Sequence, residues 1–244
     1  MPALALHVSE IALPLVHPFA IARRSIDVAR TALLRLRWNG LEGLGEAAPV
    51  PRYGESVTSI QAYFAEHALA CDDPFRLEDL LHDGLPRAAR CCLDLALHDL
   101  IGKSLNRPLW QLLGLDPAKT PVTSFTIGIS DMAITLRKVA AVADHPVLKI
   151  KLGAEACDDV ATIEAIRNIY TGTIRIDANE GWTPDDSVRY LREMERFDIE
   201  FCEQPIPAGQ PQALRWIRER VGIPIVADED SLDASSLRNL VDCV

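Results

Sequence analysis

Two lysines, Lys149 and Lys151, stand two positions apart within the apolar run of residues 147–153. They are two of only five lysines in a chain that has twenty arginines. Because side chains alternate along a strand, both ammonium groups share one face, while Leu148 and Ile150 point to the other. A like-charged neighbour and partial burial each lower the pKa of a lysine, so the pattern predicts an amine able to act as a base near neutral pH. The alternative is a solvated basic face on an edge strand.

Acidic residues end three later apolar runs at intervals of about 25 residues: Asp177 in Arg-Ile-Asp-Ala-Asn-Glu, Glu203 in Cys-Glu-Gln-Pro and Asp228 in Ala-Asp-Glu-Asp. The carboxyl ends of parallel barrel strands line the face where active sites are built, and neighbouring strands lie roughly 4.8 Å apart. We therefore expect these carboxylates to converge. Converging carboxylates repel one another unless a cation lies between them, and all-oxygen ligation suits Mg²⁺ or Mn²⁺ better than Zn²⁺. A single acidic residue at a strand end is usually a helix cap or a solvated charge, but three in consecutive register favour a metal site.

The elements that would position these groups alternate after about residue 120. Helical patterns, for instance at 161–170 and 185–196, separate strand-like runs whose starts recur at the length of one βα unit. This alternation predicts parallel strands with right-handed crossovers, as in a (β/α) TIM-type barrel. The predicted strands are 122–129, 147–152, 173–177, 199–203 and 223–228. A closed barrel of this type needs eight strands, so five predict an incomplete barrel.

Before residue 120 strand-like runs come first and helical patterns follow, which is typical of a compact α+β module. Asn39-Gly40 between two of the runs is a strong signal for a type I′ hairpin turn. A GxGxxA string at 43–48 does not fit a dinucleotide-binding fingerprint, because Pro49 and Pro51 follow where a helix should begin. The predicted strands are 4–14, 31–38 and 41–47, and the predicted helices are 56–70, 77–81, 86–103 and 109–113.

The overall composition limits the class of protein. The net charge of −10 and the pI near 5.1 argue against binding to nucleic acid or to an anionic membrane. The first residues lack the basic region of a signal peptide, and no stretch approaches the ~20 apolar residues of a membrane span. Six cysteines without CxxC spacing indicate free thiols in a reducing compartment, and scattered histidines do not indicate zinc. We therefore expect a cytoplasmic protein that acts on a small molecule.

With Lys-x-Lys, Asp-Ala-Asn, Glu-Gln-Pro and Ala-Asp-Glu on successive predicted strands, the chain resembles the enolase superfamily and its muconate-lactonising subgroup. Within that subgroup it is most similar to dipeptide epimerases of the L-Ala-D/L-Glu type. Residues 45–49, 52–56 and 94–113 look like the family's capping domain, 18–25 like its specificity loop, and 124–127 like its first barrel strand. The resemblance implies an N-terminal α+β capping domain at 1–118 and a partial (β/α) barrel at 119–244.

Carried over residue by residue, the resemblance implies that Asp177, Glu203 and Asp228 bind Mg²⁺, with Mn²⁺ as the other candidate ion. Lys151 would be the proton-transferring base, and Lys149 would help to neutralise the substrate carboxylate. The implied reaction is epimerisation: an isomerase removes the proton α to a carboxylate of a dipeptide and passes through an enediolate. Stabilisation of that enediolate by a divalent ion beside an ammonium group agrees with the residue types.

Four further residues complete the implied site. Arg24 and Thr126 would contact the substrate together with Lys149. Asn179 and Glu229 would stand behind the metal ligands and support them.

The sequence departs from the family where a second base, the strand-eight segment and the C-terminal part of the capping domain are expected. Epimerisation usually calls for bases on both faces of the α-carbon, and family members carry a second lysine on the sixth strand, whereas Lys151 is the last lysine here. We therefore expect the 244-residue chain not to be competent alone. Alternatives that keep the metal site are an N-acylamino acid racemase acting on N-acyl amino acid carboxylates, an o-succinylbenzoate synthase or a muconate cycloisomerase. A different alternative is a non-catalytic fragment that forms a homo-oligomer or binds a partner through an open barrel edge.

Overall fold

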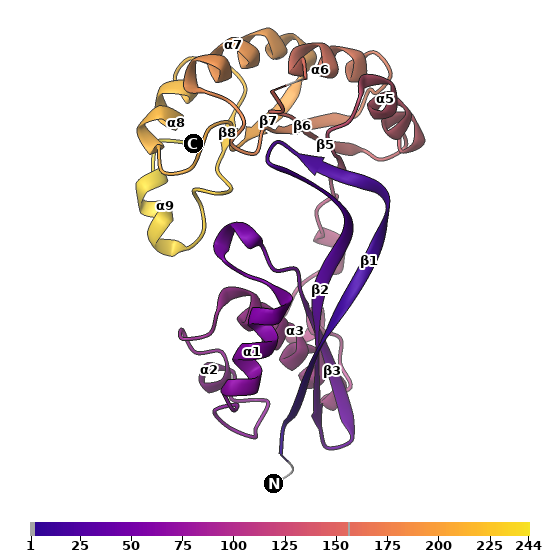
Figure 1. The fold of residues 1–244 in the computed structure, drawn as a ribbon, viewed down its shortest axis with the longest axis vertical. Coiled ribbons are helices and arrows are strands. Elements are labelled where there is room, and N and C mark those ends of the chain that lie inside the picture. Colours follow the sequence, from indigo (N-terminus) through magenta and orange to yellow (C-terminus); the bar gives the residue numbers. More distant parts are fainter. Residues whose placement is uncertain (1–2, 156) are drawn as a thin grey trace. The chain divides into compact units, whose positions relative to one another are not determined.

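The computed structural model describes residues 3–155 and 157–244, and these divide into two compact units (Figure 1). The first unit contains the chain up to Val16 together with Asp27–Thr120. The second contains Pro121–Val244 and also His17–Ile26, a segment from the N-terminal part of the sequence. The second unit therefore holds the predicted specificity segment as well as the predicted barrel strands.

The first unit is built on a three-stranded sheet with the order β1-β2-β3, formed by β1 (Ala5–Ile21), β2 (Arg24–Trp38) and β3 (Leu41–Ala47). The β2–β3 turn has positive φ at Asn39 (49°) and Gly40 (76°), as a type I′ turn requires. Strand β1 extends well beyond the predicted run of 4–14, because residues up to Ile21 continue as the strand of a hairpin with β2.

The helices of the first unit follow the sheet in the chain. They are η1 (Pro51–Tyr53), α1 (Val57–Glu66), α2 (Leu77–Leu80), α3 (Arg87–Ser104), α4 (Leu109–Leu112) and η2 (Pro117–Lys119). Ser56 caps α1 by accepting the backbone N–H of Ser59. Helix α3 supplies most of the helical core, with Cys92, Leu93 and Leu97 fully buried.

The glycines of the GxGxxA string serve packing. A Cβ added at Gly45 would lie 1.8 Å from the carbonyl oxygen of Cys92, and one added at Gly43 would lie 2.2 Å from that of Ala96. Both carbonyls belong to α3, so the two glycines allow the helix to lie directly against β3. This contact explains the motif without a nucleotide.

The second unit is a parallel sheet with the strand order β4-β5-β6-β7-β8. Its strands are β4 (Phe125–Ile127), β5 (Val147–Lys151), β6 (Thr173–Asp177), β7 (Ile199–Glu203) and β8 (Ile225–Val226). Helices fill the connections: α5 (Met132–Ala141), α6 (Asp159–Arg167), α7 (Pro184–Met194) with η3 (Glu195–Phe197), α8 (Pro211–Arg218) and α9 (Ala234–Leu240). Figure 1 shows α5 to α8 in a row along one side of the sheet. The predicted α/β fold class, an α+β module followed by part of a TIM-type barrel, is confirmed.

The core of the second unit lies between the strands and these helices. Leu148, Ile150, Ile174 and Ile176 of β5 and β6 are buried there, so the alternate residues of the same strands face the opposite side of the sheet. That alternation directs Lys149, Lys151 and Asp177 to the side away from the helices. Within the residues that the structure describes, no helix is long and apolar enough to cross a membrane.

Candidate active site

The carboxyl ends of β5, β6 and β7 bring two ammonium groups and two carboxylates together. Strand register makes Lys151 the partner of Asp177, and Asp177 the partner of Glu203. Lys151 Nζ lies 2.5 Å from Asp177 Oδ2, and Lys149 Nζ lies 2.9 Å from the same oxygen. Lys149 Nζ also donates to both carboxylate oxygens of Glu203, each at 2.7 Å. We call these four residues the strand-end cluster.

Burial and mutual charge set the ionisation of the strand-end cluster. Asp177 is fully buried, which would raise its pKa, but the charges of Lys151 and Lys149 outweigh burial and lower it. Burial and the charge of Asp177 raise the pKa of Glu203 despite its hydrogen bond from Lys149. For Lys149, burial would lower the pKa, but the hydrogen bond to Glu203 and the charge of Asp177 raise it above its usual range.

The lowered lysine pKa expected from Lys-x-Lys spacing is therefore wrong for Lys149. That expectation included only two effects on the pKa of Lys149, the neighbouring ammonium group of Lys151 and burial. The carboxylates of Asp177 and Glu203 come from the adjacent strands and lie within 3 Å of the Lys149 nitrogen, so attraction exceeds both effects. Lys149 is accordingly a cation in this arrangement.

Asp228 lies just beyond β8 and its side chain is exposed. Its strand is in register with β7 through the pair Glu203 and Val226, two residues before Asp228. The fully buried Gln204 holds the backbone there: its Oε1 accepts the N–H of Asp228 at 3.0 Å, and its Nε2 donates to Asp230 Oδ2 at 2.8 Å. The Glu-Gln-Pro motif did not predict this role of Gln204, although its position directly after Glu203 is a signal in the sequence.

The oxygen donors of the site suit a divalent cation in their chemistry. Among residues 3–155 and 157–244, no three His, Cys, Asp or Glu side chains form a ready-made metal cluster. Asp177 and Glu203 are nonetheless adjacent, and both present only oxygen donors. Two further oxygens nearby in sequence, Asn179 Oδ1 and Glu229 Oε2, are buried without a hydrogen-bond partner. An oxygen-rich set of this kind fits Mg²⁺ in its chemistry.

The remaining predicted residues lie in different settings. Thr126 on β4 is half-buried and is the register partner of Lys149 on β5. Arg24 is exposed on the hairpin tip, whereas its neighbour Arg23 reaches the segments after β6 and β8. Arg23 donates to the carbonyl oxygen of Asn179 at 2.9 Å and to Glu229 Oε1 at 2.7 Å. The sequence did not single out Arg23, because nothing in the residue type distinguishes two adjacent arginines.

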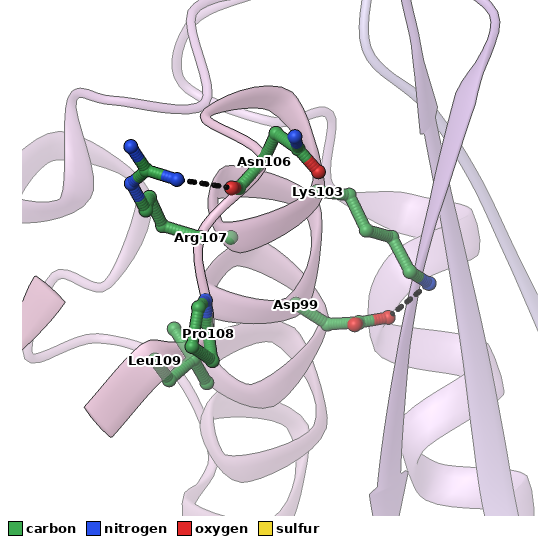
Figure 2. Close-up of a pocket in the computed structure, with 7 residues that line it drawn as sticks. Asp99, Lys103, Asn106, Arg107, Pro108 and Leu109 are labelled. Atoms are coloured by element: carbon green, nitrogen blue, oxygen red, sulfur yellow. Dashed lines mark hydrogen bonds and ion pairs between the residues drawn. The ribbon is translucent and has the colours of Figure 1, made fainter. Parts of the chain in front are cut away.

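A separate cavity lies in the first unit, and the charged side chains that line it form hydrogen bonds within the protein. It measures about 350 Å³, and Figure 2 shows the side chains that line it, at the end of α3 and the turn that follows. Lys103 Nζ donates to Asp99 Oδ2 at 2.7 Å and to the carbonyl oxygen of Glu42 at 2.8 Å. Arg107 donates to the carbonyl of Asn106. These contacts have a structural role and leave the strand-end cluster as the candidate site.

Two family models match the chain. Residues 5–114 match the N-terminal domain of mandelate racemase and muconate lactonizing enzyme, and residues 131–243 match the enolase C-terminal domain-like family. The chain therefore belongs to the enolase superfamily, as its motifs predicted.

Several proteins that are similar to this chain are dipeptide epimerases. The L-Ala-D/L-Glu epimerase of Bacteroides thetaiotaomicron is 36% identical over 228 residues, which cover 89% of this chain and 58% of that protein. The L-Ala-D/L-amino acid epimerase of Maribacter sp. is 33% identical, over 92% of this chain and 68% of that protein. Among solved structures, a dipeptide epimerase from Cytophaga hutchinsonii complexed with Mg and D-Ala-L-Val matches with a TM-score of 0.89 and 25% identity, over 99% of this chain and 69% of that one. The chain thus spans between about three fifths and 70% of the length of these relatives.

Proposed function

We propose that the protein to which this chain belongs is a Mg²⁺-dependent dipeptide epimerase, which removes and returns the proton α to a carboxylate. The observation that carries the proposal is the strand-end cluster, in which two lysines face two carboxylates at the ends of adjacent parallel strands. The identity to L-Ala-D/L-Glu and L-Ala-D/L-amino acid epimerases supports a dipeptide as the substrate.

The chemistry assigns different tasks to the two lysines. Removal of an α-proton leaves negative charge on both oxygens of the substrate carboxylate, as an enediolate, and cationic groups beside those oxygens stabilise it. Lys149, held as a cation by Asp177 and Glu203, suits that electrostatic task. Lys151 is the lysine nearer to the carboxyl end of β5, where barrel active sites form, and we assign to it the proton transfer.

We assign the Mg²⁺ ion to Asp177, Glu203 and Asp228. When bound, such an ion supplies Lewis-acid stabilisation of the developing charge on the substrate carboxylate. Asn179 and Glu229 would support the ligands, and Arg24 and Thr126 would contact the substrate. Gln204 fixes the backbone of Asp228 relative to Glu203.

We further propose that the 244-residue chain does not complete an epimerisation by itself. Its sequence offers Lys151 on one side of the substrate and no later lysine for the other. A single base can remove a proton and return it to the same face, so hydrogen exchange without inversion is the most that the chain would catalyse.

The test uses this chain together with any coding sequence that continues it, incubated with Ala-Glu dipeptides and Mg²⁺ in D₂O. We expect deuterium at the α-carbon of the glutamate residue, and Lys151→Ala should lower exchange from one epimer by about a hundredfold or more, the usual loss when a general base is removed. Lys119→Ala, which removes an exposed lysine elsewhere, is the matched control. No deuterium incorporation in the unmodified protein would refute the proposed function, and full exchange in Lys151→Ala would remove that lysine from the mechanism.

A further inference from the structure

Arg23 connects the hairpin tip, residues 17–26, to two separate strand-end segments of the second unit. Its guanidinium forms ion pairs with Glu180, which follows β6, and with Glu229, which follows β8, and it also donates to the carbonyl of Asn179. The two glutamate side chains are only 5% and 4% exposed, against 34% for Arg23. Two nearly buried carboxylates thus share one cation, which comes from a segment distant in sequence.

The tip is held at a second point on the other side of β5. The backbone N–H of Ile129, just after β4, donates to the carbonyl oxygen of Ala20 at 2.9 Å. A Cβ added at Gly128 would lie 3.1 Å from that same oxygen, so the chain passes close to β4 here. Because the sheet order is β4-β5-β6, a segment fixed at β4 and at the β6 loop must pass the end of β5, where Lys151 lies.

The β6 loop that receives Arg23 adopts an uncommon backbone conformation. Asn179 and Glu180 have φ of 46° and 67°, in the left-handed region that non-glycine residues rarely adopt. Several contacts hold them there: the Glu180 N–H donates to the carbonyl of Gln204 at 2.9 Å, and Glu180 Oε1 accepts the N–H of Ala208 at 2.8 Å. Such conformations persist only when their surroundings determine them, and Arg23 is part of those surroundings.

We propose that Arg23 is a positioning residue, a charged latch that fixes the hairpin tip across the end of β5 and thereby sets where Arg24 meets a substrate. The latch consists of the contacts of Arg23 and Ala20, whereas its effect on a dipeptide rests on the proposed function. Loss of Arg23 would leave Glu180 and Glu229 buried without their shared cation, so the tip and both loops would loosen together.

Amide hydrogen exchange of the full 244-residue chain tests the latch without any need for activity. Arg23→Gln should speed exchange in residues 17–26 by about tenfold or more, since a hydrogen-bonded charge is lost. Arg23→Lys should give an intermediate rate, because an ammonium lacks the planar fork that serves two carboxylates at once. Arg30→Gln is the matched control: Arg30 lies on the same hairpin and pairs with exposed Glu10 instead.

A double variant separates the latch from general damage. Arg23→Gln with Glu229→Gln removes the cation together with one buried carboxylate, so it should not loosen the tip beyond Arg23→Gln alone. Unchanged tip exchange in Arg23→Gln, or equal acceleration in Arg30→Gln, would overturn the latch.

Kinetics of the whole protein test the positioning role. Arg23→Gln should raise the KM for a dipeptide more than it lowers kcat, with recovery in Arg23→Lys, because tip closure contributes to substrate binding. A loosened tip with unchanged KM would overturn the positioning role. If the unmodified protein incorporates no deuterium into the α-carbon of any dipeptide, the proposed function fails. The amide hydrogen exchange of residues 17–26 still decides whether the latch exists.

Discussion

Replacement of Asp159 should separate the hydrogen-bonding role of a buried carboxylate from its charge. Asp159 is 5% exposed and sits at the start of α6. Its Oδ2 accepts the N–H of Gly153 at 3.0 Å and the indole N–H of Trp182 at 2.7 Å. These two donors lie in the segments that follow β5 and β6, which carry Lys151 and Asp177. Asp159 therefore braces the loops beneath the candidate site.

Asp159→Ala leaves the buried indole N–H of Trp182 and the half-buried N–H of Gly153 without this acceptor. Each orphaned donor costs about 1–3 kcal/mol, so we expect the free energy of unfolding to fall by roughly 2–6 kcal/mol at pH 7. Asp159→Asn keeps an oxygen for the two donors and should cost much less. Urea unfolding followed by tryptophan fluorescence measures both values. The adjacent exposed Asp158, which caps α6 by accepting the N–H of Ala161, supplies the control Asp158→Asn.

The pH dependence gives the sign of the charge effect. Burial raises the pKa of Asp159, the hydrogen bonds from Trp182 and Gly153 oppose this only in part, and the charge of Asp158 adds to it. The folded state thus holds the Asp159 proton more tightly than the unfolded chain. Its contribution to stability is fully present below the unfolded pKa and is lost as pH rises through the folded pKa.

Wild type should accordingly gain stability relative to Asp159→Asn as pH is lowered from neutral towards the ordinary carboxyl range, by at most about 1.4 kcal/mol per pH unit for one proton. The difference between the two proteins, measured between pH 4 and 7, removes the contribution of other carboxylates. A difference that stays constant or changes in the opposite direction would refute the reasoning, as would an Asp159→Ala variant as stable as wild type.

Two further predictions concern the first unit. Gly45→Ala should destabilise it by about 1–3 kcal/mol or more, because the new Cβ would lie 1.8 Å from the Cys92 carbonyl oxygen and α3 would have to move. Replacement of the exposed neighbour, Leu44→Ala, is the control. Equal unfolding midpoints for the two variants would contradict the packing argument. Burial raises the pKa of the Cys92 thiol to about 12, so iodoacetamide at pH 8 should leave Cys92 unmodified in the native chain. The exposed Cys157 should be alkylated under the same conditions, and peptide mass spectrometry measures both. Rapid labelling of Cys92 before unfolding would count against its burial.

Sequence patterns located the central strands well, because buried apolar runs bounded by turn residues leave little freedom. Strands β6 and β7 coincide with the predicted 173–177 and 199–203. The outer strands are shorter than predicted: β8 is confined to Ile225–Val226 rather than 223–228. Two features shorten β8. Pro224, directly before it, has no N–H to donate to a strand ladder, and within the described part of the chain β8 pairs with β7 alone.

The contacts of single side chains could not be predicted in the same way. Arg23 and Arg24 are adjacent, and alternation on a strand sends neighbours to opposite faces, so the register at the turn decides which arginine meets Glu229. That register depends on which residues occupy the two-residue turn between β1 and β2, and a run of two arginines does not reveal it. The sequence indicated that a cation of the tip matters, but tertiary contacts were needed to identify which one has carboxylate partners.

Charge balance links the strand-end cluster to the hairpin tip. The ammonium groups of Lys149 and Lys151 are matched by the carboxylates of Asp177 and Glu203, so the cluster as a whole offers an anionic substrate little net attraction. Among the described residues, the tip is one source of additional positive charge, and a cation held by the carboxylates would be another. Both arginines are exposed, but Arg23 already forms ion pairs with two buried glutamate side chains. On this balance we propose different tasks for the two arginines: Arg23 would hold the tip in place, and Arg24 would supply charge towards the substrate of the proposed reaction.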